Sequence, residues 1–319
     1  MPARLAALVL LLAGCASSAP RDAAPPASAL DGSALQLTWS PVDSLDARLA
    51  DGLRVYAGVS EADTLRAWAV RLPASVPLRV EVAADTADGR EPPSSIARRT
   101  GACVVLNGGY FNMETGVPVG LVVHEGRVEA PAFTSARRDG ARYAVRRGAV
   151  GLSAAGPEIA WAGGDASVAC ASDAPIPNHP ESPASTTAPC RPWAVDEALA
   201  AGPVLVRDGR DAVATEAEVF WGSHANRHPR SAIGLAPDGA VWLVVVDGRQ
   251  PVSRGVTLDE LAALMRGLGA TEALNLDGGG SSALVVQPAG GPPIRLNRPV
   301  GGDVEREVST ALVATCGAR

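Results

Sequence analysis

The sequence predicts an α+β fold with a mixed β-sheet core, a βαβ crossover near the C-terminus and few helices. Most apolar segments are short, alternate with polar residues and end at Gly, Pro, Asn or Asp, as β-strands do. Only residues 257–270 have strong helical periodicity, and they lie between two apolar runs. With 319 residues, 47% of them hydrophobic, the chain is long enough to bury a substantial core, and we predict one domain over residues 34–319.

Residues 1–15 are predicted to form a lipoprotein signal peptide. An apolar run, too short to span a bilayer, ends in the tetrad Leu12-Ala13-Gly14-Cys15. The tetrad resembles a bacterial lipobox, which implies lipidation of Cys15 and anchoring of an exported protein to a membrane of the bacterial cell envelope, facing the periplasm or the outer surface. An ordinary cleavable signal peptide that contains a cysteine is the alternative. Residues 16–33 are rich in Ala, Ser and Pro and are interpreted as a tether.

The N-terminal part of the domain is expected to be rich in strands. Three segments alternate between apolar and polar residues, namely 53–59, 65–72 and 78–85. Residues 92–102 have helical features, because Ser94 or Ser95 can cap a helix there. Later in the chain, residues 227–249 predict two strands joined by the turn Pro237-Asp238-Gly239.

The helix at residues 257–270 has the clearest boundaries. Thr257 can cap its start, Glu260 three residues later completes a capping box, and Gly269 ends it. Since apolar strands lie on both sides of this helix, we expect a crossover and a parallel pair of strands.

Three buried strands are each expected to end in Asn or Asp followed by glycine. The residues are Asn107, Asp247 and Asp277. In sheets with parallel strands, sites gather at the carboxyl ends of the strands, so these three side chains are expected to converge. Three separate turns are the alternative.

The stretch Asn275-Leu276-Asp277-Gly278-Gly279-Gly280-Ser281 predicts an anion site beside a carboxylate. Strand alternation places Asn275 and Asp277 on one face. Three glycines allow the backbone N–H groups to turn inward as an anion-binding nest. Arg230 and Arg249 lie near the predicted strand ends, where each can hold a phosphate through two hydrogen bonds. For Arg249, an ion pair with Asp247 or another acid is the alternative.

Cysteine and histidine positions bear on disulfides and metals. In an oxidising compartment four cysteines permit three pairings, of which we favour Cys170 with Cys190 around a Pro-rich stretch, leaving Cys103 with Cys316. Free buried thiols are the alternative. His224 and His228 flank Asn226, but no established metal-ligand spacing is present, so we expect neither a metal site nor a cofactor. Nucleic acid is not expected as a partner, because the basic residues are dispersed and outnumbered by acidic ones, 28 to 34.

Several motifs, in order, resemble the phosphodiester glycosidase family. They are VVLNGGYFN, AGPVLVRDG, RHPRSAIGLAPDG, LVVVDGR, GVTLDELAALMRGLGATEALNLDGGGSSALV and EREVSTALV. The resemblance is strongest over residues 90–316. Members of that family from lysosomes carry further cysteine-rich modules and a transmembrane anchor, which this sequence lacks, so a role in the bacterial envelope is expected instead.

The resemblance implies hydrolysis of the bond between a sugar's anomeric carbon and a phosphodiester oxygen. Asp277 is then expected to have the main catalytic role, as nucleophile or as base toward water, with Asp247 orienting it or stabilising positive charge on the sugar. Asn107, Gly108 and Gly109 are expected to form a polar wall of the sugar pocket. Arg230, Arg249 and the Gly278, Gly279, Gly280 and Ser281 segment are expected to hold the phosphate. Two other functions remain open: an envelope lipoprotein that binds sugar phosphates or glycans without cleaving them, and a metal-dependent phosphodiesterase that cuts the P–O bond.

Overall fold

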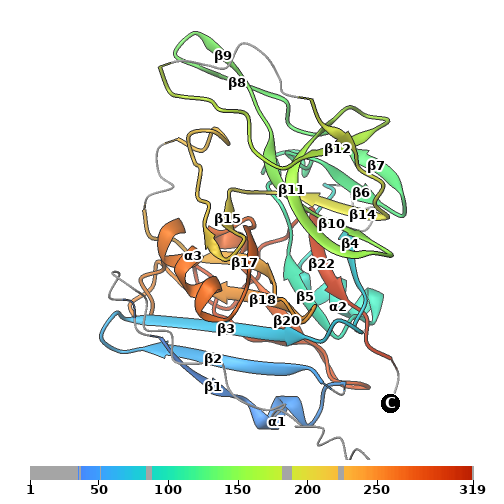
Figure 1. The fold of residues 1–319 in the computed structure, drawn as a ribbon. Coiled ribbons are helices and arrows are strands. Elements are labelled where there is room, and N and C mark those ends of the chain that lie inside the picture. The colour runs from blue at the N-terminus through green and yellow to red at the C-terminus, as the bar shows by residue number, and fades with distance from the viewer. Residues whose placement is uncertain are drawn as a thin grey trace, which may run out of the picture.

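The computed structural model describes residues 35, 37–50, 52–83, 88–181, 189–221 and 226–317. Cys15, the signal peptide, the tether and His224 lie outside these residues. The fold is mostly β, with three large sheets and one small hairpin (Figure 1). The α-helices among these residues are α1 (Asp43–Asp46), α2 (Pro93–Thr100) and α3 (Leu258–Gly267). None of the described helices is long and apolar enough to cross a membrane.

The largest sheet has eight strands and contains the predicted strands of residues 53–59, 65–72 and 227–249. Its strands, in spatial order, are β1 (Thr38–Pro41), β2 (Arg54–Ser60), β3 (Leu65–Leu72), β18 (Val241–Val246), β17 (Arg230–Leu235), β19 (Glu272–Asn275), β15 (Val204–Arg207) and β16 (Arg210–Asp211). One face packs on α3, and the other face contributes to the main core.

The second and third sheets cover the rest of the domain. The seven-stranded sheet, in the upper part of Figure 1, has the order β13 (Arg191–Pro192), β12 (Ala169–Ser172), β11 (Gly156–Gly164), β10 (Arg147–Ser153), β14 (Glu197–Ala200), β6 (Val122–His124) and β7 (Arg127–Ala130). The five-stranded sheet has the order β21 (Ile294–Arg295), β20 (Leu284–Val286), β5 (Val104–Asn107), β22 (Thr310–Ala314) and β4 (Leu78–Val82). A separate hairpin pairs β8 (Ser135–Arg138) with β9 (Ala141–Ala144). All three large sheets contribute apolar side chains to the main core.

The cap of α3 confirms its sequence prediction. The Thr257 side chain accepts a hydrogen bond from the Glu260 N–H, and the Glu260 carboxylate accepts one from the Thr257 N–H. Gly269 follows the helix with a φ of +88°, a conformation that glycine adopts without strain.

The predicted parallel pair around α3 is wrong. β18 and β19 flank β17, and both pair with it in the antiparallel sense. Every strand pairing in the described part of the chain is antiparallel, so the sheets are not mixed. The sequence between two strands does not reveal that a third strand, formed earlier in the chain, lies between them. β18 and β19 nevertheless run in the same direction, so their carboxyl ends meet one edge of the sheet on either side of the start of β17.

Both favoured disulfides are present. Cys103–Cys316 joins the chain beside the paired strands β5 and β22, and Cys170–Cys190 joins two segments 20 residues apart. Two disulfides are typical of proteins that fold in an oxidising compartment.

The two disulfides are expected to differ in their effect on stability. Their sequence separations are 213 and 20 residues, and a longer closed loop restricts the unfolded chain more. Replacing both cysteines by alanine is therefore expected to lower the free energy of unfolding by about 5 kcal/mol for Cys103–Cys316 and about 3 kcal/mol for Cys170–Cys190. Urea unfolding of the two double variants checks the order. A larger loss for the short loop would contradict it.

Candidate active site

Asp247, Arg230 and Asp277 lie at one edge of the eight-stranded sheet. Arg230 opens β17 opposite Val246, the residue before Asp247. On the other side of β17, the Leu276 N–H donates to the Ser231 carbonyl at 2.9 Å, which places Asp277 beside the start of the same strand. Because neighbouring strands are about 4.8 Å apart, the three chain segments are adjacent at this edge.

The Asn107 side chain, at the end of β5, holds the Asp277 segment through hydrogen bonds. Its Nδ2 donates to the Asp277 carbonyl at 2.7 Å, and its Oδ1 accepts from Ser231 Oγ at 2.6 Å and from the Ala283 N–H at 3.1 Å. The side chain is fully buried. Asn107 therefore links the five-stranded sheet to the eight-stranded sheet, and its part in a polar wall of the sugar pocket stays a prediction.

Gly108 and Gly109 are explained by packing. A Cβ on Gly108 would lie 2.4 Å from Thr310 Oγ1, and one on Gly109 would lie 2.4 Å from the Ala200 carbonyl oxygen. The Gly108 carbonyl accepts from the Asp277 N–H at 3.0 Å. These glycines let neighbouring backbones approach and hold the Asp277 segment, and their predicted place in a polar wall of the sugar pocket stays a prediction.

The glycine segment differs from the predicted nest. The Gly278 N–H donates to Asp277 Oδ1 at 2.9 Å, the Gly279 N–H to the Pro229 carbonyl at 2.9 Å and the Ser281 N–H to the Gly278 carbonyl at 3.1 Å. Gly279–Ser281 form a single 3₁₀ turn, with a φ of +62° at Gly279. Three of the N–H groups are thus used within the protein, and the backbone does not present them together to an anion.

Instead, the glycines make room for two guanidinium groups. A Cβ on Gly279 would lie 3.4 Å from Arg249 Nη1, and one on Gly280 would lie 2.3 Å from Arg306 Nη2. Arg306 Nη1 also donates to Ser281 Oγ at 3.5 Å. Two cationic side chains therefore lie against the turn that follows Asp277. These guanidinium groups, and not the backbone N–H groups of the glycines, are the groups suited to bind an anion here.

Asp277 is a partly buried carboxyl group beside these cations. Burial raises its pKa to about 6, although hydrogen bonds from Ser281 and Gly278 and the charge of Arg306 lower it. The charge of Asp277 also helps to raise the pKa of the Tyr110 hydroxyl, whose main cause is burial. A carboxyl group with this pKa is ionised at neutral pH and poorly solvated, as catalytic carboxylates commonly are.

Asp247 is held by hydrogen bonds from residues other than those that contact Asp277. Its side chain is buried, and its Oδ1 accepts from the Arg298 N–H at 3.0 Å and from Asn297 Nδ2 at 3.3 Å. Burial raises its pKa to about 6. Asn297 Nδ2 also donates to the Ser282 carbonyl at 3.0 Å, so it connects Asp247 to the glycine segment. The two carboxyl groups are thus at one sheet edge but have different hydrogen-bond partners.

The two predicted arginines have different surroundings. Arg230 is buried, and it donates to the Val256 and Asn226 carbonyls at 3.3 and 3.1 Å. Arg249 has a φ of +56° and contacts His228 Nδ1 through Nε at 3.2 Å and Nη2 at 2.9 Å. Within the described ranges Arg249 forms no ion pair with Asp247 or another acid, so that alternative is not observed.

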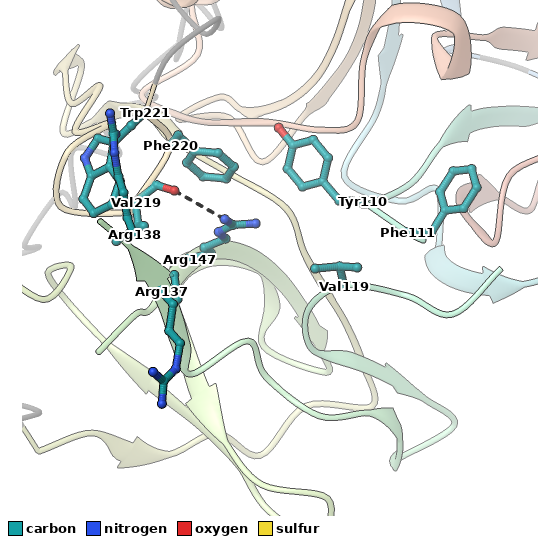
Figure 2. A pocket seen from close by; sticks show the side chains of 10 residues that line it. Tyr110, Phe111, Val119, Arg137, Arg138, Arg147, Val219, Phe220 and Trp221 are labelled. Atoms are coloured by element: carbon teal, nitrogen blue, oxygen red, sulfur yellow. Dashed lines mark hydrogen bonds between the residues drawn. The ribbon is translucent and has the colours of Figure 1, made fainter. Parts of the chain in front are cut away.

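Asn275 ties the site to a neighbouring loop. Its Nδ2 donates to the Gly202 carbonyl at 2.8 Å and to Tyr110 Oη at 3.0 Å, and the Tyr110 hydroxyl donates to the same carbonyl at 2.9 Å. The side chain is buried, and no hydrogen-bond partner of its Oδ1 is found among the described residues. Asn275 thus fixes Tyr110, which also lines a cavity of about 550 Å³ (Figure 2).

The sequence interpretation missed Arg306, Tyr110, Ser231 and Asn297. Tyr110 directly follows the two glycines after Asn107, and Arg306 lies in the motif EREVSTALV, so both were within motifs of the family resemblance. Asn297 lies in no such motif, and only its position in the fold indicates its role. The described residues contain no cluster of three or more His, Cys, Asp or Glu side chains that could hold a metal ion.

Comparisons with known proteins agree with the fold and the motifs. Residues 100–315 match the family model described as phosphodiester glycosidase. A segment of 83 residues is 37% identical to the SPbeta prophage-derived protein YomE of Bacillus subtilis (strain 168), covering 26% of this chain and only 13% of that protein.

The solved structures similar to this one include the following two. A hypothetical protein from Synechocystis superposes with a TM-score of 0.59 at 19% identity, covering 82% of this chain and 62% of that one. The catalytic domain of zebrafish N-acetylglucosamine-1-phosphodiester alpha-N-acetylglucosaminidase, auto-inhibited by its pro-peptide, superposes with a TM-score of 0.56 at 19% identity, covering 88% of this chain and 89% of that one. At this identity the two likenesses show the fold.

Proposed function

Because the chain belongs to the phosphodiester glycosidase family, we propose that it hydrolyses the bond between the anomeric carbon of a sugar and the oxygen of a phosphodiester. The observation that carries this proposal is the arrangement of Asp277 with Arg249 and Arg306. A poorly solvated carboxylate lies beside a turn against which two guanidinium groups pack. This arrangement suits a substrate that has an electrophilic carbon next to a phosphate.

In this proposal the phosphate is held by Arg306 and Arg249, and Asp277 acts at the anomeric carbon. The leaving group is a phosphate monoester, a weakly basic anion, so stabilising its charge matters more than protonating it. Asp277 serves as nucleophile or as the base for water. Asp247, held by Asn297 and Arg298, serves as the second carboxylate that stabilises positive charge on the sugar or keeps the site in place.

The products of a simple diester test the function. The purified protein is incubated with the methyl diester of N-acetylglucosamine 1-phosphate, the sugar class named in the zebrafish relative, and with the corresponding diesters of other sugars. Cleavage as proposed releases free sugar and methyl phosphate, which ³¹P NMR distinguishes from sugar 1-phosphate and methanol. Release of sugar 1-phosphate, lost on adding a chelator, would instead indicate a metal-dependent phosphodiesterase. Binding of the diesters without cleavage would indicate a binding protein.

The pH dependence of kcat/KM is expected to report how many carboxylates must be ionised. The pKa values of Asp277 and Asp247 are both raised to about 6 by burial, so both groups take up protons below that pH. We expect kcat/KM to fall below pH 6, about tenfold per pH unit if Asp277 alone must be ionised and up to about 100-fold if both must be. If both carboxylates must be ionised, the Asp247→Asn variant is expected to lose only about tenfold in kcat/KM per pH unit, in place of the roughly 100-fold of the wild type. A flat profile between pH 4 and 7 contradicts the proposed role of Asp277.

This loss is expected to occur in the folded protein. Both pKa values lie above those of the unfolded chain, so the folded protein holds these two protons more tightly. Lowering the pH from 6 to 4 therefore favours the folded state as far as these groups are concerned. Near-UV circular dichroism at pH 5 checks that the tertiary structure persists.

We also propose that the enzyme is anchored to the cell envelope through a lipid on Cys15. The lipobox tetrad supports this proposal, and the two disulfides agree with export. Expression in a bacterium fed a radiolabelled fatty acid is expected to label the wild type and not Cys15→Ser. If the wild type and Cys15→Ser were labelled equally, or if neither were labelled, the first residues would be better interpreted as an ordinary signal peptide.

A further inference from the structure

Residues 137–147 form a basic segment in an otherwise acidic protein. They contain Arg137, Arg138, Arg142, Arg146 and Arg147 but a single acid, Asp139, whereas the whole chain has a net charge of −6. The basic residues are therefore less evenly dispersed than the sequence first indicated.

The hairpin of β8 and β9 brings some of these charges together. It places Arg137 directly opposite Arg142. Like charges at opposed positions destabilise a hairpin, so an anionic partner would relieve this repulsion.

Part of this segment lines the cavity that Tyr110 borders. We call it the Arg147 pocket. Its volume is about 550 Å³, and Figure 2 shows Arg147 beside Phe220 and Arg138 against Trp221, while the Arg137 side chain points away from Arg147. The lining residues are Tyr110, Phe111, Val119, Ala136, Arg137, Arg138, Arg147, Val219, Phe220 and Trp221.

Aromatic rings hold two of the guanidinium groups. Arg147 Cζ lies 4.1 Å from the centre of the Phe220 ring and 4.6 Å from that of Phe133, and Arg138 Cζ lies 4.7 Å from the Trp221 ring. Rings on the guanidinium faces leave the N–H groups at the edges available for an anion.

Arg147 forms no ion pair with a carboxylate of the described residues, although the charge of the buried Glu218 acts on it. Its Nη2 donates to the Val219 carbonyl at 3.5 Å, and its buried Nε finds no hydrogen-bond partner among the described residues. No carboxylate of those residues lies within ion-pair distance of it. A poorly solvated cation of this kind favours binding of an anion.

The buried acid whose charge acts on Arg147, Glu218, is already engaged by other groups. The Glu218 carboxylate accepts from the Gly148 N–H at 2.7 Å, and from Trp161 Nε1 and the Val204 N–H at 2.9 Å each. Next to it, Val219 has a φ of +60°, a conformation that costs a β-branched residue about 1–3 kcal/mol. Glu218 thus anchors the loop that carries the pocket residues Val219 and Phe220, and the loop is held in a strained form at the pocket.

The Arg147 pocket is electrostatically connected to the proposed catalytic carboxylate. The charges of Asp277 and of Arg147 both act on the pKa of Tyr110, which Asp277 raises and Arg147 lowers. Tyr110 also bonds to Asn275, two residues before Asp277. Tyr110 therefore lies between the pocket, which it lines, and the strand end that carries Asp277.

We propose that the Arg147 pocket binds a second anionic group of the substrate, carried by the part that leaves with the phosphate. This inference rests on the proposed function and narrows it to glycosyl phosphodiesters whose leaving part has a further phosphate, as in a chain of phosphodiester-linked units. Arg147 provides the main contact, and Arg138 and Arg137 lie at the rim.

Matched substrates test the second anion. In all of them N-acetylglucosamine 1-phosphate is esterified to glycerol, whose far end carries a phosphate monoester, a methyl phosphate diester or a neutral methyl carbonate. We expect kcat/KM to be about 10- to 100-fold higher for the charged substrates than for the neutral one, the usual range for a hydrogen-bonded charge. If kcat/KM is raised only for the phosphate monoester, the pocket binds the end of a chain. If kcat/KM is raised equally for the methyl phosphate diester, the pocket accepts an internal unit of a polymer.

Variants assign the effect to the pocket. Arg147→Gln is expected to reduce the ratio of charged to neutral kcat/KM to about 1–3, since one charge-assisted contact is lost. Arg138→Gln, at the exposed rim, is expected to reduce it partly and serves if Arg147→Gln does not fold. Arg127→Gln, on an exposed edge strand, is the matched control and is expected to keep the wild-type ratio.

Binding separates this inference from the proposed function. Calorimetry with Asp277→Asn protein measures the affinity for the phosphate-bearing and neutral glycerol compounds without turnover. If no diester is cleaved by the wild type but the charged compound binds more tightly in an Arg147-dependent manner, the hydrolase proposal fails and the pocket is supported. Equal kcat/KM and equal affinity for charged and neutral compounds would overturn the pocket.

Discussion

Replacing Asp277 by asparagine is expected to lower kcat about 10²- to 10⁴-fold, the range that a catalytic acid or base contributes. The variant keeps the shape of the side chain, and its Oδ1 can still accept from the Gly278 N–H. What it loses is the negative charge at the anomeric carbon. The measurement is release of reducing sugar from a phosphodiester under saturating substrate.

The same variant is expected to be at least as stable as the wild type at pH 7. Burial raises the pKa of Asp277 from its ordinary value of 3.8 to about 6, so ionisation at neutral pH costs the folded state up to about 3 kcal/mol. Removing the charge removes this cost. A variant that is inactive but unfolds at higher denaturant concentration than the wild type separates a catalytic role from a structural one.

Asp247→Asn is the matched control. Its Oδ1 accepts from Asn297 and Arg298, and in the variant an amide oxygen can still accept these bonds but without the negative charge, so the segment around residues 297–298 is held less firmly. We expect a smaller effect, up to about 10²-fold, as for a displaced catalytic group. If Asp247→Asn abolished activity and Asp277→Asn did not, the assignment of the two residues would have to be exchanged.

Local features of the fold could be predicted from the sequence. The helix at residues 257–270 has its cap, its apolar face and its final glycine within 14 consecutive residues, and these features fix its type and limits. The turn at Pro237-Asp238-Gly239 likewise determines the pairing of β17 with β18. In both cases the interactions that decide the structure join residues close in sequence.

Long-range arrangement could not be predicted in the same way. The pairing of β19 with β17 and not with β18 depends on which strands bury the most apolar surface together, and no local pattern records it. The role of the glycines was misjudged for the same reason. They permit the close approach of Arg249 and Arg306, which lie 30 residues before and 26 residues after Gly279 and Gly280.

Arg306→Gln is expected to lower kcat/KM for phosphodiesters about 10²- to 10³-fold, the effect of removing one group that stabilises developing negative charge. Arg306 is exposed, and among the described residues it forms no ion pair with a carboxylate, so little loss of stability is expected. An aryl glycoside without phosphate provides a second readout, because its leaving group carries no phosphate for Arg306 to hold. Arg210→Gln, on the exposed edge strand β16, is the control.

Gly280→Ala tests whether the glycine acts through Arg306. A Cβ at this position would lie 2.3 Å from Arg306 Nη2, so the guanidinium group must move away from the turn. The variant is expected to lose activity in the same direction as Arg306→Gln, and the double variant is expected to lose no more than Arg306→Gln alone, since the arginine can be displaced only while it is present. Additive losses would mean that the glycine has a separate role at Asp277, and the arginine would no longer explain why the turn lacks side chains.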